Sequence, residues 1–479
     1  MTILFAASEM DPLARTGGLG DVIEAMPAAL RERGHEVSVV LPYYRTIRES
    51  EGFTIKPTGV EIPIQVGSKR ITAEILESIA PNGVQVFLVR QDEFFDRPGI
   101  YGTEGRAFDD NAERFIFFSK AVVELARRVL PPPQILHVHD WQAALVPVLV
   151  KERRLPFKTV LTIHNLAYQG SFWAYDFGLT NLPGDYFGPN GVEFYGSMNL
   201  LKGGIVHADA LTTVSERYAR EILTPEYGAG LDVVLQENSA KLSGILNGAD
   251  YSLWNPESDR LIPQNYSSET LAGKKVCRAA LLAELELAPN PVGPVFSIVS
   301  RLASQKGIDL LLPVIDRLLA DDVRLIVLGE GDLEFERELT IASRRHEGRF
   351  AYRKDMDTRL SHMIEAGSDI TLIPSHYEPC GLTAMYGLRY GTLPIARATG
   401  GLHEIIQDYD QTRDAGTGFL FYDATPEAFW DAILRAKRLF QDEVHWQSIM
   451  RRAMQQDFSW PRAVERYEAV YEKALRSRK

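Results

Sequence analysis

The chain has 479 residues, of which 45% are hydrophobic and 24% charged, and its net charge is −12. This length predicts two or more domains with ample core. The acidic balance argues against a nucleic-acid or acidic-lipid partner, because those partners require basic patches. It allows a neutral partner such as a sugar polymer, although solubility alone also explains it. Two cysteines make neither a disulfide framework nor a zinc site. With no leader and no apolar run of membrane-spanning length, we expect a cytoplasmic protein.

The first element is a short apolar run, TILFAAS, followed by the glycine-rich stretch ARTGGLGDV that starts at Ala14. After Asp21 the apolar residues fall at helical spacing, so the glycines lie between a predicted strand and a predicted helix. Such a turn lets backbone N–H groups approach a ligand, and a helix N-terminus favours an anion such as phosphate. The pattern is neither G-x-G-x-x-G nor a Walker loop. A tight turn with no ligand explains it equally well.

Alternating strands and helices follow. We expect buried strands at 37–41, 84–90, 134–140, 158–165 and 210–215, helices at 112–129 and 141–152, and a pair of alternating strands at 61–79. After a polar stretch at 255–268 the pattern restarts, with strands expected at 294–301, 323–332, 369–375 and 392–401. This order predicts two doubly wound α/β domains in series, which face each other across a deep cleft. We expect domains at 1–250 and 251–460, and a helix at 461–479 that packs back on the first domain.

Polar residues follow many of these strands, where ligands bind in doubly wound sheets. The stretches HVHDWQ, TIHNLAYQG and ILNGAD supply Asp140, Trp141, His164, Asn165 and Asn247. Such a mixture of donors and acceptors beside an aromatic ring is typical of a carbohydrate site. In the second half, SRLASQKG supplies Arg301 and Lys306, two cations suited to a diphosphate. HYEPCGL supplies Glu378 and Cys380.

Each of these signals has another interpretation. Trp141 equally fits packing at a helix start. Glu378 fits a helix cap, as do the aspartates of DMD at 355–357, which also resemble a metal–diphosphate pair. The histidines His137, His139 and His164 match no zinc spacing, so we expect no metal site. No G-x-S-x-G motif supports a serine nucleophile.

The chain resembles the starch and glycogen synthase family over essentially its full length. The matching stretches are RTGGLGDV, HDWQAAL, TIHNLAYQG, EFYGSMNLLKGGIVHADALTTVS, TPEYGAGLD, LNGAD, SRLASQKGID, EPCGL, TGGL and FSW, in the family's order and spacing. The resemblance implies a GT-B fold and retaining transfer of glucose, usually from ADP-glucose, to the non-reducing end of an α-1,4-glucan. It implies no cofactor and no metal.

By motif position, the resemblance also implies the site residues. The catalytic group would be His164, Arg301, Lys306 and Glu378, with Glu378 orienting and stabilising charge rather than acting as nucleophile. The donor would be bound by Arg15, Gly17, Gly18, Asp21, Asp140, Asn165, Asn247, Met356, Cys380, Gly381, Leu382 and Thr383. The acceptor would meet Trp141 and Tyr101.

The sequence departs from the family at several of these positions. Arg15 stands where bacterial members usually have Lys, and Ala384 where many have Gln. The stretch SHYEP replaces SRFEP, and Met356 occupies the place of an aromatic residue that often faces the base. These changes make UDP-glucose a second candidate donor. A glucan phosphorylase would need a pyridoxal-phosphate lysine motif and a longer chain. A catalytically silent glucan-binding homologue is disfavoured by the presence of His164 and Glu378. Oligomeric state and regulation are not predicted.

Overall fold

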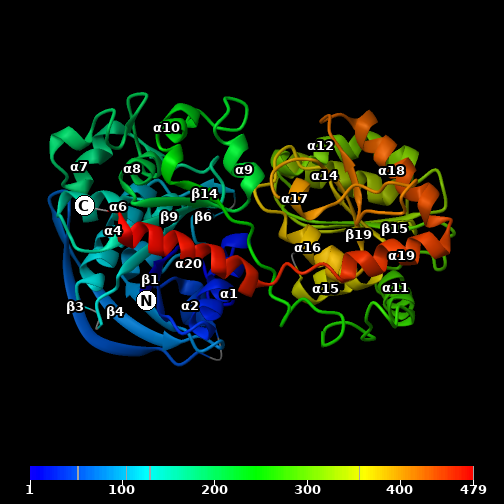
Figure 1. Ribbon diagram of the computed structural model, residues 1–479, viewed down its shortest axis with the longest axis horizontal. Coiled ribbons are helices and arrows are strands. Elements are labelled where there is room, and N and C mark those ends of the chain that lie inside the picture. The colour runs from blue at the N-terminus through cyan, green and yellow to red at the C-terminus, as the bar shows by residue number, and fades with distance from the viewer. Residues whose placement is uncertain (51–52, 104, 129–130, 355–356, 478–479) are drawn as a thin grey trace. The chain divides into compact units, whose positions relative to one another are not determined.

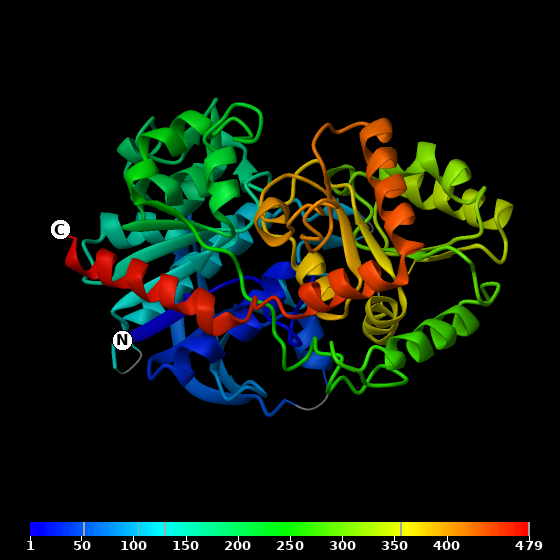
Figure 2. The same cartoon turned by 45° about the vertical axis from the view of Figure 1, so that its right-hand side comes forward.

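The computed structural model describes residues 1–50, 53–103, 105–128, 131–354 and 357–477. The chain divides into two compact units. Unit 1 is Met1–Gly248 together with Trp460–Lys479, and unit 2 is Ala249–Ser459. The passages that leave and re-enter unit 1 run side by side, because Ala249 and Ser459 form an isolated parallel β-bridge (Figure 2).

Unit 1 is built on a nine-stranded sheet of order β14-β13-β9-β8-β1-β2-β5-β4-β3. Seven strands are parallel: β1 (Thr2–Ala6), β2 (Glu36–Pro42), β5 (Gln85–Arg90), β8 (Ile135–His139), β9 (Lys158–Ile163), β13 (Ala210–Thr213) and β14 (Leu242–Gly244). The expected pair of alternating strands is the antiparallel pair β3 (Lys56–Val66) and β4 (Lys69–Ile79). The predicted doubly wound α/β class is confirmed here.

The helices of unit 1 cover this sheet. They are α1 (Gly18–Glu32), α2 (Arg45–Glu49), α3 (Asp92–Phe95), α4 (Asn111–Ala126), α5 (Asp140–Ala143), α6 (Leu145–Glu152), α7 (Phe177–Thr180), α8 (Leu200–His207), α9 (Glu216–Glu221), α10 (Asp232–Glu237) and α20 (Trp460–Arg476). Short strands β6 (Gly102–Thr103), β7 (Arg106–Ala107), β10 (Ser171–Phe172), β11 (Glu193–Phe194) and β12 (Ser197–Asn199) form two small sheets. The helix expected at 112–129 ends at Ala126, and Val129 lies outside the described residues.

The C-terminal helix α20 belongs to unit 1 and lies beside α1 (Figure 1). Its buried residues recur at helical spacing: Trp460, Ala463, Val464, Tyr467, Val470, Tyr471 and Ala474. Glu468 pairs with Arg33 and His35 at the end of α1, and the Tyr471 hydroxyl lies 2.8 Å from His137 Nδ1. These contacts attach α20 to the core of unit 1.

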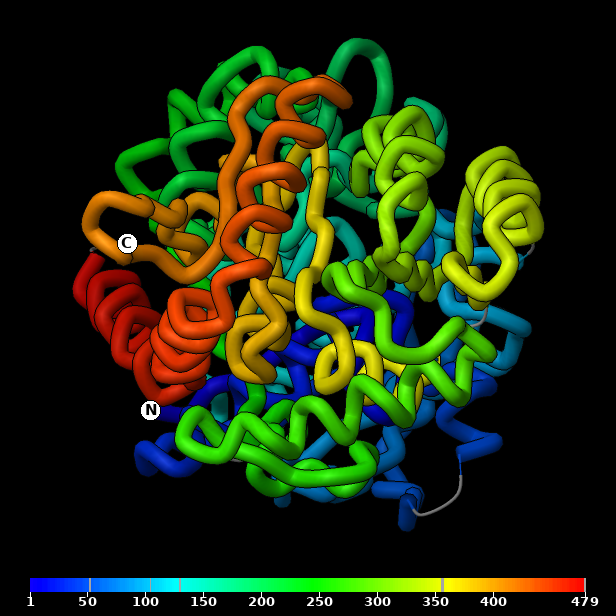
Figure 3. Tube along the Cα trace, turned by 90° about the vertical axis from the view of Figure 1, so that its right-hand side faces the viewer, coloured from blue at the N-terminus to red at the C-terminus, as the bar shows by residue number. Residues whose placement is uncertain are grey.

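Unit 2 has a six-stranded, wholly parallel sheet of order β17-β16-β15-β18-β19-β20. The strands are β15 (Val295–Val299), β16 (Arg324–Leu328), β17 (Phe350–Arg353), β18 (Ile370–Ile373), β19 (Leu393–Arg397) and β20 (Phe419–Phe421). The helices are α11 (Ala272–Glu284), α12 (Ile308–Leu311), α13 (Ile315–Leu318), α14 (Leu333–Arg345), α15 (Thr358–Gly367), α16 (Leu382–Arg389), α17 (Leu402–Ile405), α18 (Pro426–Phe440) and α19 (Glu443–Met454). Figure 3 shows α11 packed along α15.

Candidate functional site

The glycine-rich loop of unit 1 is held by a buried carboxylate, Glu9, which lies three residues after the end of β1. Glu9 Oε2 accepts the backbone N–H groups of Thr16, at 2.7 Å, and Gly17, at 3.0 Å. Glu9 Oε1 accepts the hydroxyls of Thr16, at 2.8 Å, and Tyr101, at 2.6 Å. The N–H of Gly17, which we expected to face a ligand, is therefore used inside the protein.

Glu9 was missed at the sequence level. Its only signal was a polar pair, Ser8 and Glu9, directly after a buried strand. Gly17 is extended, and α1 begins at the next residue, Gly18. The first-turn N–H groups of such a helix have no intrahelical partner and favour an anion. The anion-binding potential of this stretch therefore resides in α1 rather than in Gly17.

Arg15 and Asp21, both expected at the donor, form an ion pair. The two N–O distances are 3.0 and 3.1 Å, and the Arg15 side chain is 40% exposed. Asp11 lies 3.8 Å from the same guanidinium. A Cβ at Gly20 would lie 3.1 Å from the Arg15 side chain, so a side chain there would shift Arg15 slightly. The loop thus carries one arginine close to two carboxylates.

The ends of β8 and β9 bring Asp140, His164 and His139 together. Asp140 has a positive φ of 54° and accepts the backbone N–H of His164 at 2.7 Å. His164 Nε2 lies 2.9 Å from His139 Nδ1, so one imidazole donates to the other. Neighbouring parallel strands explain this arrangement, because their carboxyl ends lie on one edge of the sheet.

Burial sets the protonation of this cluster. It raises the pKa of Asp140 to about 7, although the N–H groups of His164 and Asn165 oppose the shift. It lowers the pKa of His164 to about 3, and that of His139 well below its usual value. Near neutral pH both imidazoles are therefore uncharged, and Asp140 takes up a proton far more readily than an exposed aspartate does.

The two residues expected at the acceptor have structural contacts. The Trp141 ring packs edge-on against Phe115 and Phe172, at centroid distances of 4.9 and 5.5 Å. A Cβ at Gly170 would overlap the same ring. Tyr101 donates to Glu9, as described above. Neither contact tests sugar binding, which remains a prediction for both residues.

Asn165 and Asn247 complete the expected set in unit 1. The Asn165 side chain accepts the N–H of Ala167 and so shapes the turn after β9. Asn247 is 4% exposed, and its Oδ1 is buried without a hydrogen-bond partner among the described residues. A buried amide oxygen of this kind is costly unless a ligand or water donates to it. Among the expected residues that the structure describes, Asn247 is therefore the one whose buried side chain has an unmet acceptor.

In unit 2, Lys306 and Glu378 form a close ion pair. Lys306 Nζ lies 2.6 Å from Glu378 Oε2, and the Ser375 hydroxyl donates to the same oxygen at 3.0 Å. Lys306 follows β15 and Glu378 follows β18, and these strands are neighbours. A small pocket beside the pair is lined by ten residues, which include Lys306, Glu378, Gly381 and Thr383. Arg301 lies exposed between β15 and Lys306.

The loop that carries Glu378 and Cys380 packs against a pair of glycines. A Cβ at Gly400 would overlap the Glu378 carbonyl oxygen, and one at Gly401 would overlap that of Cys380. Gly401 N–H donates to the Glu378 carbonyl at 3.1 Å. The two glycines of the TGG motif therefore allow the backbone at 400–401 to lie directly against the backbone at 378–380.

The helix α16 starts immediately after this loop. Gly381, with φ of 97°, precedes it, and Leu382 and Thr383 form its first turn. The N-cap position is Gly381, so the interpretation of Glu378 as a helix cap is wrong. Thr383 lines the pocket beside Lys306.

One of the sequence departures, His376 of the SHYEP stretch, has a local explanation. His376 Nε2 lies 2.9 Å from both carboxylate oxygens of Asp309. Arg397 donates to the backbone oxygens of Ser375 and His376, and so fixes the loop before Glu378.

In the DMD stretch, Asp357 accepts the Leu360 N–H at 3.0 Å and caps α15. Asp355 and Met356 lie outside the described residues.

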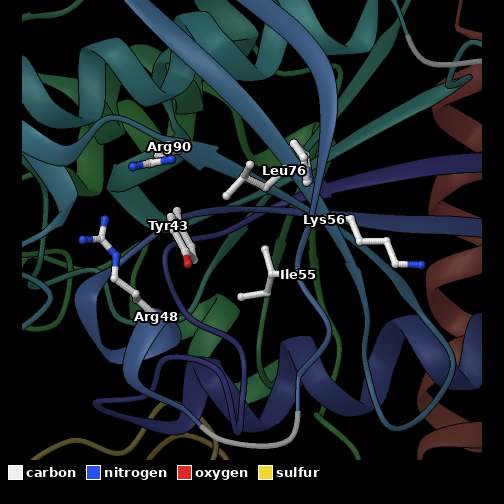
Figure 4. A pocket seen from close by; sticks show the side chains of 7 residues that line it. Tyr43, Arg48, Ile55, Lys56, Leu76 and Arg90 are labelled. Atoms are coloured by element: carbon white, nitrogen blue, oxygen red, sulfur yellow. The ribbon is translucent and has the colours of Figure 1, made fainter.

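A further pocket of about 380 Å³ lies in unit 1, and none of the expected residues lines it; Figure 4 shows its lining side chains. It is lined by Tyr43, Arg48, Ile55, Lys56, Pro57, Leu76 and Arg90. Its two arginines are bound to Asp92, and also to Asp96 and Glu74. Because none of the residues implied by the family resemblance lines this pocket, we assign it no part in the chemistry.

Across the described residues, no group of three or more His, Cys, Asp or Glu is placed to hold a metal ion. The helices of the same residues include none with the length and apolar character needed to cross a membrane.

Comparison with known proteins gives one consistent picture. Residues 2–237 match the family described as starch synthase catalytic domain, and residues 286–451 match glycosyl transferases group 1. The chain is 46% identical to a glycogen synthase of Koribacter versatilis, over 100% of this chain and 99% of the relative. It is 41% identical to glycogen synthase 2 of Geobacter sulfurreducens, over 100% of both.

Solved structures agree with these relatives. The catalytic domain of starch synthase IV from Arabidopsis thaliana, bound to ADP and acarbose, superimposes with a TM-score of 0.92 at 32% identity, covering 99% of each chain. Sucrose-phosphate synthase from Thermosynechococcus elongatus has a TM-score of 0.62 at 17% identity, covering 98% of each chain, and so shares the fold.

Proposed function

Because the chain belongs to the glycogen synthase family of glycosyltransferases, we propose that it transfers glucose from ADP-glucose to the non-reducing end of an α-1,4-glucan. The glucan is lengthened by one residue and ADP is released. The predicted family, enzyme class and GT-B fold are confirmed by the relatives and by the Arabidopsis structure. The donor, the acceptor end and the residue roles are the proposal.

The observation that carries the proposal is the ion pair between Lys306 and Glu378, with the exposed Arg301 five positions before Lys306. Transfer breaks the bond between the anomeric carbon and the diphosphate oxygen, so positive charge develops on the sugar and negative charge on the leaving group. Preformed cations placed where negative charge grows are usually the largest catalytic contribution. We assign Arg301 and Lys306 to the diphosphate and Glu378 to the orientation of the glucosyl unit.

The cluster at the ends of β8 and β9 is assigned to the glucosyl group as well. Asp140, His164, Asn165 and the unpaired Asn247 Oδ1 supply hydrogen-bonding groups to sugar hydroxyls. Uncharged imidazoles suit this role, because they offer one donor and one acceptor each. The first turn of α1 and Arg15 are assigned to the diphosphate.

The proposed chemistry retains the anomeric configuration. The acceptor hydroxyl attacks from the face that the diphosphate leaves, its oxygen bonds to the anomeric carbon, and its proton passes to the departing phosphate oxygen. No side chain becomes glucosylated in this scheme, so Glu378 needs no role as nucleophile. The proposed location is the cytoplasm, in keeping with two free cysteines, Cys277 and Cys380.

The decisive experiment measures nucleotide release by the purified protein, with ADP-glucose and UDP-glucose compared and with glycogen present or absent. Glucan-dependent release of ADP, unchanged by a chelator, would support the whole proposal. Faster release from UDP-glucose would overturn the donor and keep the reaction class. No release from either donor, in a folded protein that still binds glycogen, would favour the silent homologue.

A further inference from the structure

One short segment of unit 1 exposes a group of aromatic side chains. Tyr168, Trp173, Tyr175 and Tyr195 are 51%, 69%, 76% and 87% exposed. Among the described residues, the only other aromatic ring with comparable exposure is Tyr422 of unit 2, at 63%. Exposed rings gathered in this way usually mark a binding surface.

Trp173 and Tyr195 directly follow the two outer strands of the small sheet β10-β12-β11, and Tyr175 lies in the 3-10 turn Ala174–Asp176 just after Trp173. Phe172 pairs with Met198, and Phe194 pairs with Ser197, so Trp173 and Tyr195 leave the two outer strands at nearly the same level. Two strand spacings, about 10 Å in all, separate the outer strands. The Trp173 and Tyr175 rings lie together, with centroids 4.3 Å apart.

This sheet is firmly tied to the candidate site. The Asn199 side chain donates to Gln169 Oε1 at 2.7 Å, and Gln169 donates to the Ala229 carbonyl at 2.9 Å. Gly170 lies directly against the Trp141 ring, as described above. Hydrogen bonds and packing therefore fix the sheet beside the rings to the turn that begins at His164.

The charge of the segment limits what it can bind. Residues 171–199 contain no Lys, Arg or His, but three acids: Asp176, Asp185 and Glu193. An anionic ligand, such as a phosphate or a nucleic acid, would find no counter-charge there. A sugar polymer is neutral, and the C–H faces of its rings pack on aromatic faces while its hydroxyls remain in water.

We propose that Trp173, Tyr175 and Tyr195 form an aromatic platform that holds a length of acceptor glucan away from the point of transfer. The assignment of the ligand as α-glucan rests on the proposed function. The platform keeps long glucan chains bound near the site of transfer. A glucan too short to reach the platform binds no more tightly because of it.

The test is electrophoresis in native gels that contain glycogen, where binding slows migration. We expect Trp173→Ala and Tyr195→Ala to bind glycogen about five- to tenfold more weakly. Trp173→Phe keeps a ring and should bind at close to the wild-type strength. Tyr422→Ala, an equal truncation of an exposed ring, is the control and should bind as wild type. Thermal unfolding establishes that each variant is folded.

Kinetics supply the second readout. KM for glycogen should rise in Trp173→Ala, whereas kcat and KM with maltotriose should stay at the wild-type values. Wild-type binding by both alanine variants, or an equal loss in Tyr422→Ala, would overturn the platform. So would a change of oligomeric state with unchanged glycogen binding, since the rings would then be a protein interface. The gel assay contains no nucleotide sugar, so it tests glycogen binding by the platform even if the proposed glucosyl transfer is not observed.

Discussion

Lys306 Nζ lies 2.6 Å from Glu378 Oε2, and this pair joins the carboxyl ends of two neighbouring strands, β15 and β18. Ser375 donates to the same carboxylate oxygen, which fixes the carboxylate from a second side. The ammonium is thereby held in one place before any anion arrives. A cation placed in advance costs no reorganisation when negative charge develops.

The first prediction concerns the charges of this pair. Lys306→Ala should lower kcat by about 10²–10³, as the loss of a preformed group that stabilises developing charge does elsewhere. Glu378→Gln keeps the shape but removes the charge and should also lower kcat strongly. Nucleotide release at saturating donor and glycogen measures both. Lys275→Ala is the matched control, because Lys275 pairs with Glu443 on the surface. A Lys306→Ala enzyme with the kcat of wild type would contradict the role of Lys306.

The second prediction concerns Glu9. In Glu9→Gln an amide NH₂ replaces one accepting oxygen, so an N–H or hydroxyl of the glycine-rich loop loses its partner. We expect a loss of about 1–3 kcal/mol in the free energy of unfolding and a higher KM for the donor. Tyr101→Phe removes a hydroxyl that contacts both Glu9 and Ser8, but it leaves the backbone N–H groups of the loop bound to Glu9 and should cost less. Urea unfolding and donor kinetics measure these effects. A Glu9→Gln protein with unchanged stability and KM would show that the loop keeps its shape without the carboxylate.

Much of the fold followed from sequence because its strands are buried on both faces and appear as apolar runs. Such runs locate β1, β8 and β15 without knowledge of tertiary contacts. The close pairing of Lys306 with Glu378 depends on strand order, since 72 positions separate the two residues. Local patterns carry no information on that order.

The role of Glu9 was unpredictable for a similar reason. Its partner Tyr101 is 92 positions away, and the pairing depends on how a long connection folds back over β1. The glycine-rich stretch therefore suggested that the N–H of Gly17 is available to a ligand, whereas that N–H donates to Glu9. Glycine patterns indicate where backbone can approach closely, but they do not identify what approaches.

The third prediction concerns Arg15, which replaces the usual Lys. Arg15→Ala should lose most of the activity with little change in stability, because its ion pair with Asp21 is substantially exposed and such pairs contribute little. Arg15→Lys should retain activity, with a changed KM for the donor because the ammonium lacks the planar fork. Transfer assays and thermal unfolding separate the two effects. Wild-type activity in Arg15→Ala would remove this residue from the site.

The fourth prediction compares two glycines. A Cβ at Gly401 would overlap the Cys380 carbonyl, so Gly401→Ala must displace the loop that carries Glu378. We expect a loss of about 1–3 kcal/mol in stability, together with a strong loss of kcat. At Gly17 a Cβ meets nothing within 4 Å, and the backbone is extended. Gly17→Ala should therefore cost less, at most about 1 kcal/mol, because it loses only the preference for glycine over alanine at the N-cap of α1. Equal unfolding midpoints for the two variants would refute the packing argument.

The last prediction concerns the pH dependence of stability, to which His164 and Asp140 contribute with opposite signs. The pKa of His164 is lowered by burial to about 3 from 6.5, so the unfolded chain takes up this proton first. Stability is therefore lost as the pH falls from 6.5 toward 3, and His137 and His139 act in the same direction. The pKa of Asp140 is raised to about 7 from 3.8, so the native state binds the extra proton and stability rises as the pH falls through that window.

Two variants should separate these contributions. Within this cluster three histidines oppose one aspartate, so the cluster should contribute a net loss of stability between about pH 7 and about pH 5. His164→Gln should make that loss smaller, and Asp140→Asn should make it larger. Urea midpoints of both variants and wild type at the two pH values measure the change. Parallel shifts, with the same pH dependence in all three proteins, would mean that neither group has a perturbed pKa.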